Sequence, residues 1–205
     1  LSLLTSTSRD LPERHQTLRA AIEWSYALLR PEEQTAFRAL SVFQGGWSLA
    51  GAEAVIGLDD VATMEILASL RDKSRVRLTE TDDTEPRYTM LETIQEYGLE
   101  QLAASGELDA TQATHAEFFV QLSAEASQFI QGGPHQHRWL GILDREIANL
   151  RAALQGVLQL GRAEPAVDLS INLWDYWSTR GLLEEGQRWL SSALTLAAEA
   201  DQTLR

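Results

Sequence analysis

The sequence contains no cysteine among its 205 residues, and this absence removes several kinds of chemistry at once. Disulfide bonds, thiolate metal sites and thiol catalysis all require cysteine side chains. The sequence also lacks any apolar run of about 18 residues, and no basic segment precedes an apolar one near its start. It therefore predicts no disulfide, no membrane span and no secretory signal, and we expect a cytoplasmic location.

Basic residues are scarce relative to acidic ones. The chain has 17 Lys and Arg residues against 30 Asp and Glu residues, which gives a formal net charge of −13 at pH 7. Proteins that bind nucleic acids neutralise phosphates with clustered Lys and Arg side chains, so an acidic chain repels DNA at long range unless one face is locally basic. General affinity for nucleic acid is therefore not expected.

The motifs that mark common active sites are also absent. The sequence has no GxxxxGK[ST] phosphate loop, no GxSxG nucleophile elbow, no HExxH zinc helix and no EF-hand loop. The closest approach to a metal cluster is the pair His135 and His137, which has no third ligand nearby and lies beside a Gly/Pro segment. We therefore expect a solvated loop at these histidines, no catalytic residue and no metal site.

One short stretch has the pattern of a β-hairpin. Val76 and Leu78 alternate with polar residues, and so do Tyr88 and Met90, as half-buried strands require. A polar turn separates the two runs. From Met90 onward the apolar residues recur at helical spacing until Gly106 ends the pattern. A lone hairpin among helices predicts a winged helix, in which the wing folds back onto a closing helix.

Four helical segments precede this hairpin. Pro31 occupies a first-turn position of the second, Ser48 can cap the third, and Asp59 or Asp60 can cap the fourth. In the fourth segment four apolar residues are expected to face inward: Val61, Met64, Leu67 and Leu70. With the hairpin and the helix after it, these segments complete the winged helix pattern.

From residue 107 onward the sequence predicts helices only. Long periodic segments, each with one apolar stripe, are separated by breaks at residues 132–134, Gly161 and Gly181. Residues 150–154 have an echo at residues 190–194, at a spacing typical of helical-hairpin repeats. The predicted fold is therefore mainly α, with a winged helix domain that contains one β-hairpin, followed by an antiparallel helical-hairpin array.

A basic run offers the best argument for a nucleic-acid surface. It consists of Arg71, Lys73, Arg75 and Arg77, at the end of the fourth helix and in the first strand. Asp72 interrupts the run, and further acidic residues follow in the turn of the hairpin. A solvated or partner-facing surface is the favoured interpretation, and a phosphate-contacting surface is the alternative.

The tryptophans of the second half are a second candidate surface. Trp139, Trp174, Trp177 and Trp189 recur at helical positions and could line a ligand groove within a curved array. Large aromatic residues at such spacing more often pack in a core. Core packing and a ligand groove both remain open interpretations.

Several segments resemble a known family. They are RHQTLRAAIEWSYALLRPEEQTAFRALSVFQGGWSLAGAEAV, LASLRDKSRVRL and PRYTMLETIQEYGLEQLAASGE. Together they resemble the winged-helix part of bacterial STAND ATPases, signal-transducing NTPases of the LuxR- and SARP-type regulator class that are related to plant and animal NB-ARC proteins. The segments REIANLRAAL and RGLLEEGQRWLSSAL resemble the opening of the tetratricopeptide-like (TPR-like) sensor array that follows in such proteins.

The resemblance implies a switch controlled by a nucleotide. In the family an upstream P-loop domain binds ADP or ATP, the winged helix closes over the nucleotide in the resting state, and the repeats sense an inducer. A Met-His-Asp triplet in NB-ARC relatives places its His against the ADP phosphate. The residues aligned with it here are Met90, Leu91 and Glu92. Leu91 cannot donate a hydrogen bond, so closure is expected to depend on packing and on Glu92.

The leading hypothesis is a non-catalytic regulatory fragment of a STAND ATPase. Residues 1–14 are assigned to a linker from an upstream nucleotide-binding region, residues 15–106 to the winged helix domain, and residues 107–205 to the first part of the TPR-like array. The expected partners are that upstream domain and an inducer, either a small molecule or a protein, on the repeats. No cofactor is expected in the fragment, and ADP or ATP is expected in the full-length protein.

Two alternatives remain. The first is a DNA-binding winged-helix transcription factor, and the second is a helical-repeat module that binds a ligand or a peptide.

Overall fold

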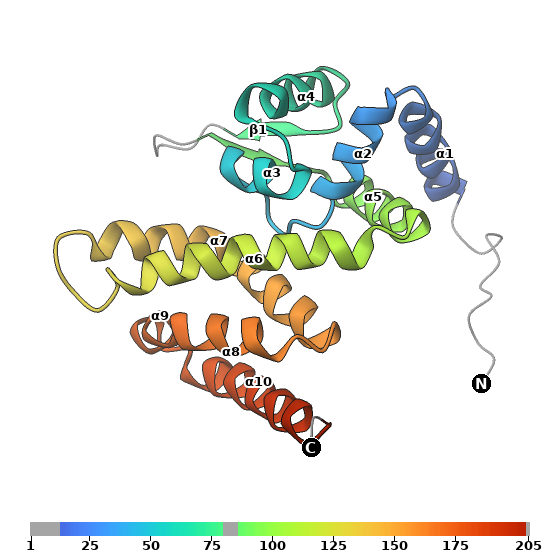
Figure 1. The fold of residues 1–205 in the computed structure, drawn as a ribbon. Coiled ribbons are helices and arrows are strands. Elements are labelled where there is room, and N and C mark those ends of the chain that lie inside the picture. Colours follow the sequence, from blue (N-terminus) through green and yellow to red (C-terminus); the bar gives the residue numbers. More distant parts are fainter. Residues whose placement is uncertain (1–12, 80–85, 204–205) are drawn as a thin grey trace.

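The computed structural model describes residues 13–79 and 86–203 (Figure 1). In the first part of the chain the elements are α1 (Glu13–Ala27), α2 (Pro31–Leu40), α3 (Leu49–Ile56), α4 (Asp60–Asp72), β1 (Arg77–Thr79), β2 (Arg87–Thr89) and α5 (Glu92–Ser105). The second part consists of α6 (Leu108–Ser127), α7 (Gln136–Gln159), α8 (Ala163–Asn172), α9 (Trp174–Arg180) and α10 (Leu183–Thr203). The predicted fold class, mainly helical with one hairpin, is confirmed.

The first part has the architecture of a winged helix. Strands β1 and β2 pair antiparallel with Leu78 opposite Tyr88. Trp47, between α2 and α3, adds a one-residue bridge on the other side of β2, where the N–H groups of Trp47 and Tyr88 each donate to the other's carbonyl at 2.9 Å. The order along the chain is therefore α2, the Trp47 bridge, α3, α4 and the hairpin, and this is the order of elements in a winged helix. The acidic turn predicted between the strands lies in residues 80–85, outside the described residues.

The helix ends follow from local sequence. The Ser48 hydroxyl accepts a hydrogen bond from the N–H of Gly51 at the start of α3, and Asp59 accepts one from the N–H of Ala62 at the start of α4. Gly57 ends α3 in the left-handed conformation, with φ +77°, a backbone region that glycine enters without steric cost. The predicted caps are thereby confirmed.

The inward face of α4 differs from the prediction. Leu67 and Leu70 are buried as expected, but Val61 is 58% exposed and Met64 is 46% exposed. Thr63 and Ile66 are buried in their place. Two stripes of α4 contain apolar residues at helical spacing, and only the packing of α2 and α3 against one side of the helix decides which stripe is covered.

Leu78 was expected to be buried in β1 but is 37% exposed. The strand has no described element packed over its outer face, and all three of its residues are exposed. Val76, just before β1, is buried as predicted. The residue just before β1 is therefore buried, whereas the residues of β1 itself are not.

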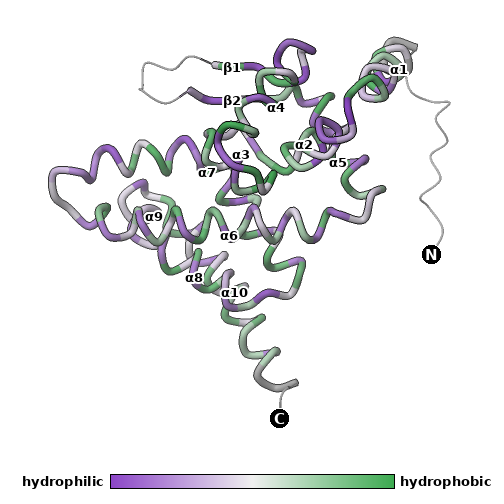
Figure 2. The backbone as a smooth tube through the Cα atoms, turned by 45° about the horizontal axis from the view of Figure 1, so that its top comes forward, coloured by the Kyte–Doolittle hydropathy of each residue, from purple (hydrophilic) through white to green (hydrophobic). Residues whose placement is uncertain are grey.

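Three layers make up the molecule. Helices α6 and α7 pack against each other and lie between the winged helix elements on one side and α8 to α10 on the other (Figure 1). Hydrophobic and hydrophilic residues alternate along α6 and α7, as expected of amphipathic helices (Figure 2). The periodic segment predicted between Gly161 and Gly181 is divided into two helices, because α8 ends at Asn172 and α9 begins at Trp174. Among the described residues, no helix is long and apolar enough to cross a membrane.

Aromatic residues join the first layer to the second. The Phe43 ring stacks on Trp47 with centroids 5.4 Å apart, and it also contacts the rings of His115 and Phe119 of α6 at 5.0 and 6.4 Å. All four side chains are buried. The hydrophobic core is therefore continuous across the expected domain boundary at residues 106 and 107.

Candidate functional site

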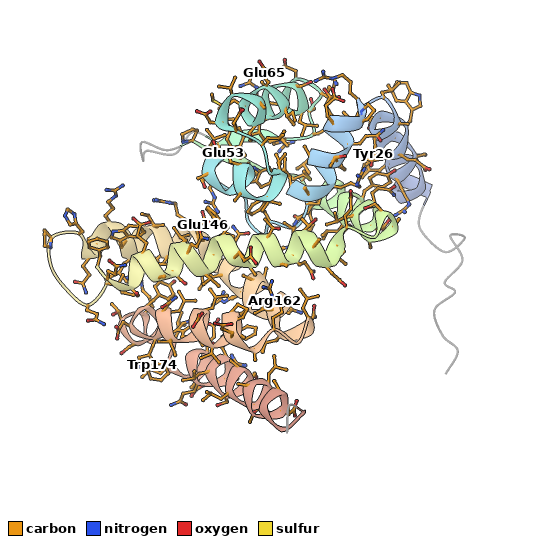
Figure 3. All side chains as sticks on the ribbon, in the orientation of Figure 1. Tyr26, Glu53, Glu65, Glu146, Arg162 and Trp174 are labelled. Atoms are coloured by element: carbon orange, nitrogen blue, oxygen red, sulfur yellow. The ribbon has the colours of Figure 1, made fainter. Side chains whose placement is uncertain are left out.

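Arg87 connects the wing to the helical array. Its guanidinium forms an ion pair with the carboxylate of Glu146 in α7, and the two side chains are only 13% and 9% exposed. The same guanidinium donates to the carbonyl oxygens of Gly46 at 3.0 Å and Arg145 at 3.1 Å. Glu146 lies between the winged helix and the array, as Figure 3 shows. The charge of Arg87 is thus compensated within the protein.

Asn149 extends this contact into the core. Its side chain is fully buried and donates to the carbonyl of Gly46 at 2.8 Å and to Glu146 Oε2 at 2.7 Å. Its Oδ1 accepts a hydrogen bond from the N–H of Gln44 at 2.6 Å. We call Arg87, Glu146 and Asn149 the junction clamp. The clamp holds the loop before Trp47 between β2 and α7.

The backbone geometry of the junction clamp requires a glycine at position 46. Its φ is +95°, and a Cβ atom at this position would lie 2.6 Å from the carbonyl oxygen of Tyr88. A side chain here would therefore be strained and would also push the loop away from β2. The closeness of the loop to the strand is what lets Arg87 and Asn149 reach the same carbonyl.

His115 lies beneath the clamp as a buried, neutral imidazole. Burial lowers the pKa of His115 to about 4, and nearby Asn149 acts in the opposite direction. The ring contacts those of Phe43 and Phe119, and its Nε2 has no hydrogen-bond partner among the described residues. His115 is therefore a buried core residue.

One cation of the basic run, Lys73, pairs with a buried carboxylate of the same domain. The Lys73 ammonium contacts both carboxylate oxygens of Glu33 in α2 at 2.7 and 2.6 Å, and Ser69 donates to the same carboxylate at 2.6 Å. Glu33 is fully buried and also accepts from the N–H of Arg30 at 2.7 Å. Burial raises the pKa of Glu33, but the hydrogen bonds from Lys73, Ser69 and Arg30 outweigh it and lower that pKa to about 2. This contact also satisfies the N–H of Arg30, at a helix start without a capping side chain of its own.

The remaining cations of the run have different surroundings. Arg71 lies 3.6 Å from Asp72, and Arg75 is half-buried and donates to the Lys73 carbonyl at 3.1 Å. Arg77 is exposed in β1.

The exposed face of α4, the helix that precedes the wing, is not basic. It carries Val61 and Met64 together with Glu65, which points outward in Figure 3. An apolar and acidic face suits contact with a protein better than contact with phosphates.

The residues aligned with the nucleotide-contacting triplet lie together at the start of α5. Met90 is half-buried, and its Sδ lies 3.7 Å from the Ser41 hydroxyl, which donates to it. Leu91, at the N-cap, is 41% exposed, and Glu92 is exposed in the first turn. Leu91 and Glu92 therefore stand on the surface at the base of the wing.

The four tryptophans do not line a common groove. Trp177 is fully buried and packs onto Gly186, where a Cβ atom would lie 2.6 Å from its ring. Trp174 is 36% exposed and lies at the start of α9, at the lower left in Figure 3. Trp139 and Trp189 are half-buried and line two different hollows. Core packing accounts for Trp177, and Trp139 alone reaches the hollow next to the junction clamp.

Sequence reasoning missed the residues that form the clamp. Glu146 and Asn149 lie three residues apart within the stripe of α7, where the pattern otherwise predicts apolar side chains. The signal in the sequence is a pair of polar residues inside the apolar stripe of a helix. That helix follows a wing that carries an arginine, which is a suitable partner for them. In the described ranges no group of three or more His, Asp or Glu side chains could hold a metal ion.

The comparison with protein families supports the architecture. Residues 29–103 match a family described as the winged helix-turn-helix domain. This range begins in the turn before α2 and ends in the last turn of α5. This part of the chain is therefore a winged helix-turn-helix domain.

The relatives are mycobacterial proteins. The "Putative HTH-type transcriptional regulator Mb0914c" of Mycobacterium bovis and the "Putative HTH-type transcriptional regulator Rv0890c" of Mycobacterium tuberculosis are each 39% identical to the chain over 197 residues. These alignments cover 94% of the chain but 22% of each relative. The "Uncharacterized protein Rv0894" of M. tuberculosis is 37% identical over 123 residues, which is 58% of the chain and 31% of that protein. No solved structure matches the chain.

Proposed function

We propose that this chain is a non-catalytic regulatory unit of a transcriptional regulator, in which the winged helix domain and the helical array move as one body. The observation that carries this proposal is the junction clamp, in which a buried ion pair and a buried amide join β2, the loop before Trp47 and α7. A linkage of this kind passes a displacement of the array directly to the wing. The names of the relatives, which describe HTH-type transcriptional regulators, support the regulatory role.

The finer proposal follows the resemblance to STAND ATPases. In it the winged helix closes over an ADP-loaded P-loop domain upstream in the same protein, and an inducer on TPR-like repeats opens the molecule. Leu91 and Glu92, at the start of α5, support it because both are exposed and therefore accessible to such a domain. The apolar and acidic exposed face of α4 supports a protein partner as well.

The test of the finer proposal is the rate of ADP release from the full-length protein. Leu91→Asp puts a charge into the expected apolar contact and should speed release, while Leu91→His should slow it by restoring a phosphate donor. The matched control is Leu183→Asp, since Leu183 of α10 is 43% exposed, close to the 41% of Leu91. Equal release rates in all three variants and the parent protein would rule out a lid that closes at Leu91.

DNA binding is the second candidate function, and the match to the winged helix-turn-helix family favours it. Arg71 and Arg77 are its expected phosphate contacts, because Lys73 is neutralised by Glu33. Affinity for duplex DNA that falls steeply with salt, and that is lost in a double Arg71→Glu and Arg77→Glu variant, would establish it. Binding that is absent at low salt would eliminate it.

A further inference from the structure

A hollow lies beside the junction clamp, where the winged helix meets the array. It has a volume of about 350 Å³ and is bounded by the start of α3, the base of the wing, α6 and α7. This volume is in the range of small-molecule sites. Arg87 and Glu146 of the clamp form part of its wall, and Glu146 is labelled in Figure 3. An occupant of the hollow would therefore touch the residues that join the wing to the array.

Four large apolar side chains line the hollow and are only half-buried. Phe118 and Leu122 come from α6, and Trp139 and Ile142 come from α7. Each keeps part of its surface accessible to solvent, so apolar surface from two adjacent helices gathers in one concave place. An apolar ligand would remove this surface from water, and that removal favours binding.

The Trp139 indole has a fixed orientation in the wall of the hollow. The ring of Phe129 stacks on it with centroids 5.6 Å apart and an interplanar angle of 3°. Phe129 thus covers one face of the indole, and the remainder of the ring system is what Trp139 can present to the hollow. A side chain already held in place loses little conformational freedom when a ligand binds. Such a wall suits a flat aromatic ligand, which can stack on it or meet its edge.

The charged groups of the hollow are matched in sign. Arg87 pairs with Glu146 in the clamp, and Arg145 also has an interaction partner within the chain. The two that remain, Arg138 and Glu125, are one cation and one anion. A charged ligand would therefore lose its hydration without meeting an unmatched opposite charge, whereas a neutral ligand would lose little. The lining favours a neutral ligand.

Two neutral polar side chains also line the hollow. The Ser48 hydroxyl accepts a hydrogen bond from the N–H of Gly51 at 3.2 Å and keeps its own hydrogen for another acceptor. Gln121 contributes an amide, which can both donate and accept. A ligand with one N–H, hydroxyl or carbonyl group can therefore find a hydrogen-bond partner here.

We propose that this hollow binds a neutral, flat aromatic molecule of two or three rings with one hydrogen-bonding group. The rings lie against Trp139 between α6 and α7, and the polar group meets Ser48 or Gln121. Because the walls come from the winged helix and from the array, the bound molecule contacts both. This binding does not rest on the proposed function, since it is measured on this chain alone, whereas the lid is tested by ADP release from the full-length protein.

Fluorescence titration of the chain with N-phenyl-1-naphthylamine tests the site, because this neutral probe emits strongly only in apolar surroundings. The paired probe is 8-anilino-1-naphthalenesulfonate, which has the same rings and one added sulfonate. The neutral probe should bind, and the sulfonate should bind about tenfold more weakly or worse, since its charge meets no unmatched cation.

Two variants place the bound probe in the hollow. Trp139→Leu removes the aromatic wall and should weaken binding of the neutral probe about two- to tenfold. Its matched control is Trp24→Leu, on α1, where the indole is 69% exposed, and this change should leave affinity unaltered. Ala50→Phe places a ring at the exposed edge of the hollow and should weaken binding about tenfold or more by filling the space.

A third variant tests the balance of charge. Glu125→Gln leaves Arg138 without an opposite charge in the lining, so it should strengthen binding of the sulfonate and leave the neutral probe unaffected. Far-ultraviolet circular dichroism confirms that each variant is folded. The proposal would be overturned by absence of binding of the neutral probe, by binding of the sulfonate to the parent chain that is as tight or tighter, or by unchanged affinity for the neutral probe in either Trp139→Leu or Ala50→Phe.

Discussion

The guanidinium of Arg87 and the carboxylate of Glu146 form a nearly buried ion pair between residues 59 positions apart in the sequence. The pair joins the wing of one part of the molecule to the second helix of the other. Arg87 also donates to three backbone carbonyls, those of Gly45, Gly46 and Arg145, and Glu146 also accepts from Asn149. With these additional hydrogen bonds the charges are compensated, so the removal of a single member leaves the others unsatisfied in the core.

Removal of Arg87 should therefore be costly. Arg87→Met is expected to lower the free energy of unfolding by about 3–5 kcal/mol, because it leaves the Glu146 charge buried without a partner. Urea denaturation followed by circular dichroism measures the change. Arg19→Met is the matched control, since the Arg19–Glu100 pair is about half exposed on both sides and should contribute less than about 1 kcal/mol. Equal losses in the two variants would show that the clamp is no stronger than a surface pair.

A replacement of both members should cost less than either single change. The double variant Arg87→Met and Glu146→Leu removes both charges, so neither remains buried alone. Its free energy of unfolding should lie above that of Arg87→Met. A double variant less stable than the single one would mean that packing around the methylene groups, rather than charge compensation, holds the junction.

Gly98 should tolerate no side chain, although it lies in the middle of α5. A Cβ atom at this position would lie 1.8 Å from Ser41 Oγ and 2.8 Å from Ser41 Cβ. Gly98→Ala is therefore expected to destabilise the chain by about 1–3 kcal/mol through overpacking. Gly141→Ala is the control in α7, where a Cβ meets nothing within 4 Å and helix propensity predicts a gain of up to about 1 kcal/mol. Thermal unfolding of the two variants should give shifts of opposite sign.

Acid should destabilise the chain first through His115. Its pKa is about 4 in the folded protein against an ordinary value of about 6.5, so between these values the unfolded chain binds a proton that the folded chain does not. The free energy of unfolding should thus fall by about 3 kcal/mol as the pH decreases from 6.5 to 4. In His115→Gln this part of the pH dependence should disappear.

A second acid-sensitive group acts at lower pH. Glu33 has a folded pKa of about 2 against an ordinary value of 4.5, so its contribution to stability is complete above pH 4.5 and is lost as the pH falls toward 2. Chemical denaturation at a series of pH values separates the two windows. A His115→Gln variant with an unchanged slope above pH 4.5 would contradict the assignment to His115.

Lys73 and Arg77 should differ in what they do, although both belong to the basic run. Lys73→Met removes a direct partner of the buried Glu33 carboxylate and should lower the free energy of unfolding by about 2–4 kcal/mol, because Ser69 and Arg30 remain. Arg77→Met, on an exposed strand, should change it by less than about 0.5 kcal/mol. Equal stability of the two variants would mean that the contact of Lys73 with Glu33 contributes little to stability and would return Lys73 to the candidate DNA surface.

Local chemistry accounts for the parts of the fold that were predicted from sequence. Ser48 and Asp59 cap their helices through backbone contacts three residues away, and Gly57 and Gly106 end theirs in the left-handed conformation. The alternation around Tyr88 indicated the hairpin. These features depend on neighbours along the chain, so a single sequence contains the information needed to find them.

The site residues could not be predicted in the same way. Val61 and Met64 fit an inward stripe of α4 as well as Ile66 does, and only the placement of α2 and α3 selects between the stripes. Arg87 is one of the polar residues that alternate with Tyr88 and Met90, and Glu146 and Asn149 lie within a segment of helical periodicity. Apart from the contact between Glu146 and Asn149, which lie three residues apart, the partners of these residues lie 41 to 105 residues away.

The sequence by itself determined the class of fold, several helix ends, the hairpin and the absence of thiol chemistry, since each follows from composition or from contacts within a few residues. Only the tertiary structure decided that Lys73 pairs with Glu33 and that the tryptophans lie in different places. It also decided that a buried ion pair and a hollow lie at the junction. The physical reason is that buried polar groups need partners, and those partners are brought together by packing of distant segments rather than by spacing along the chain.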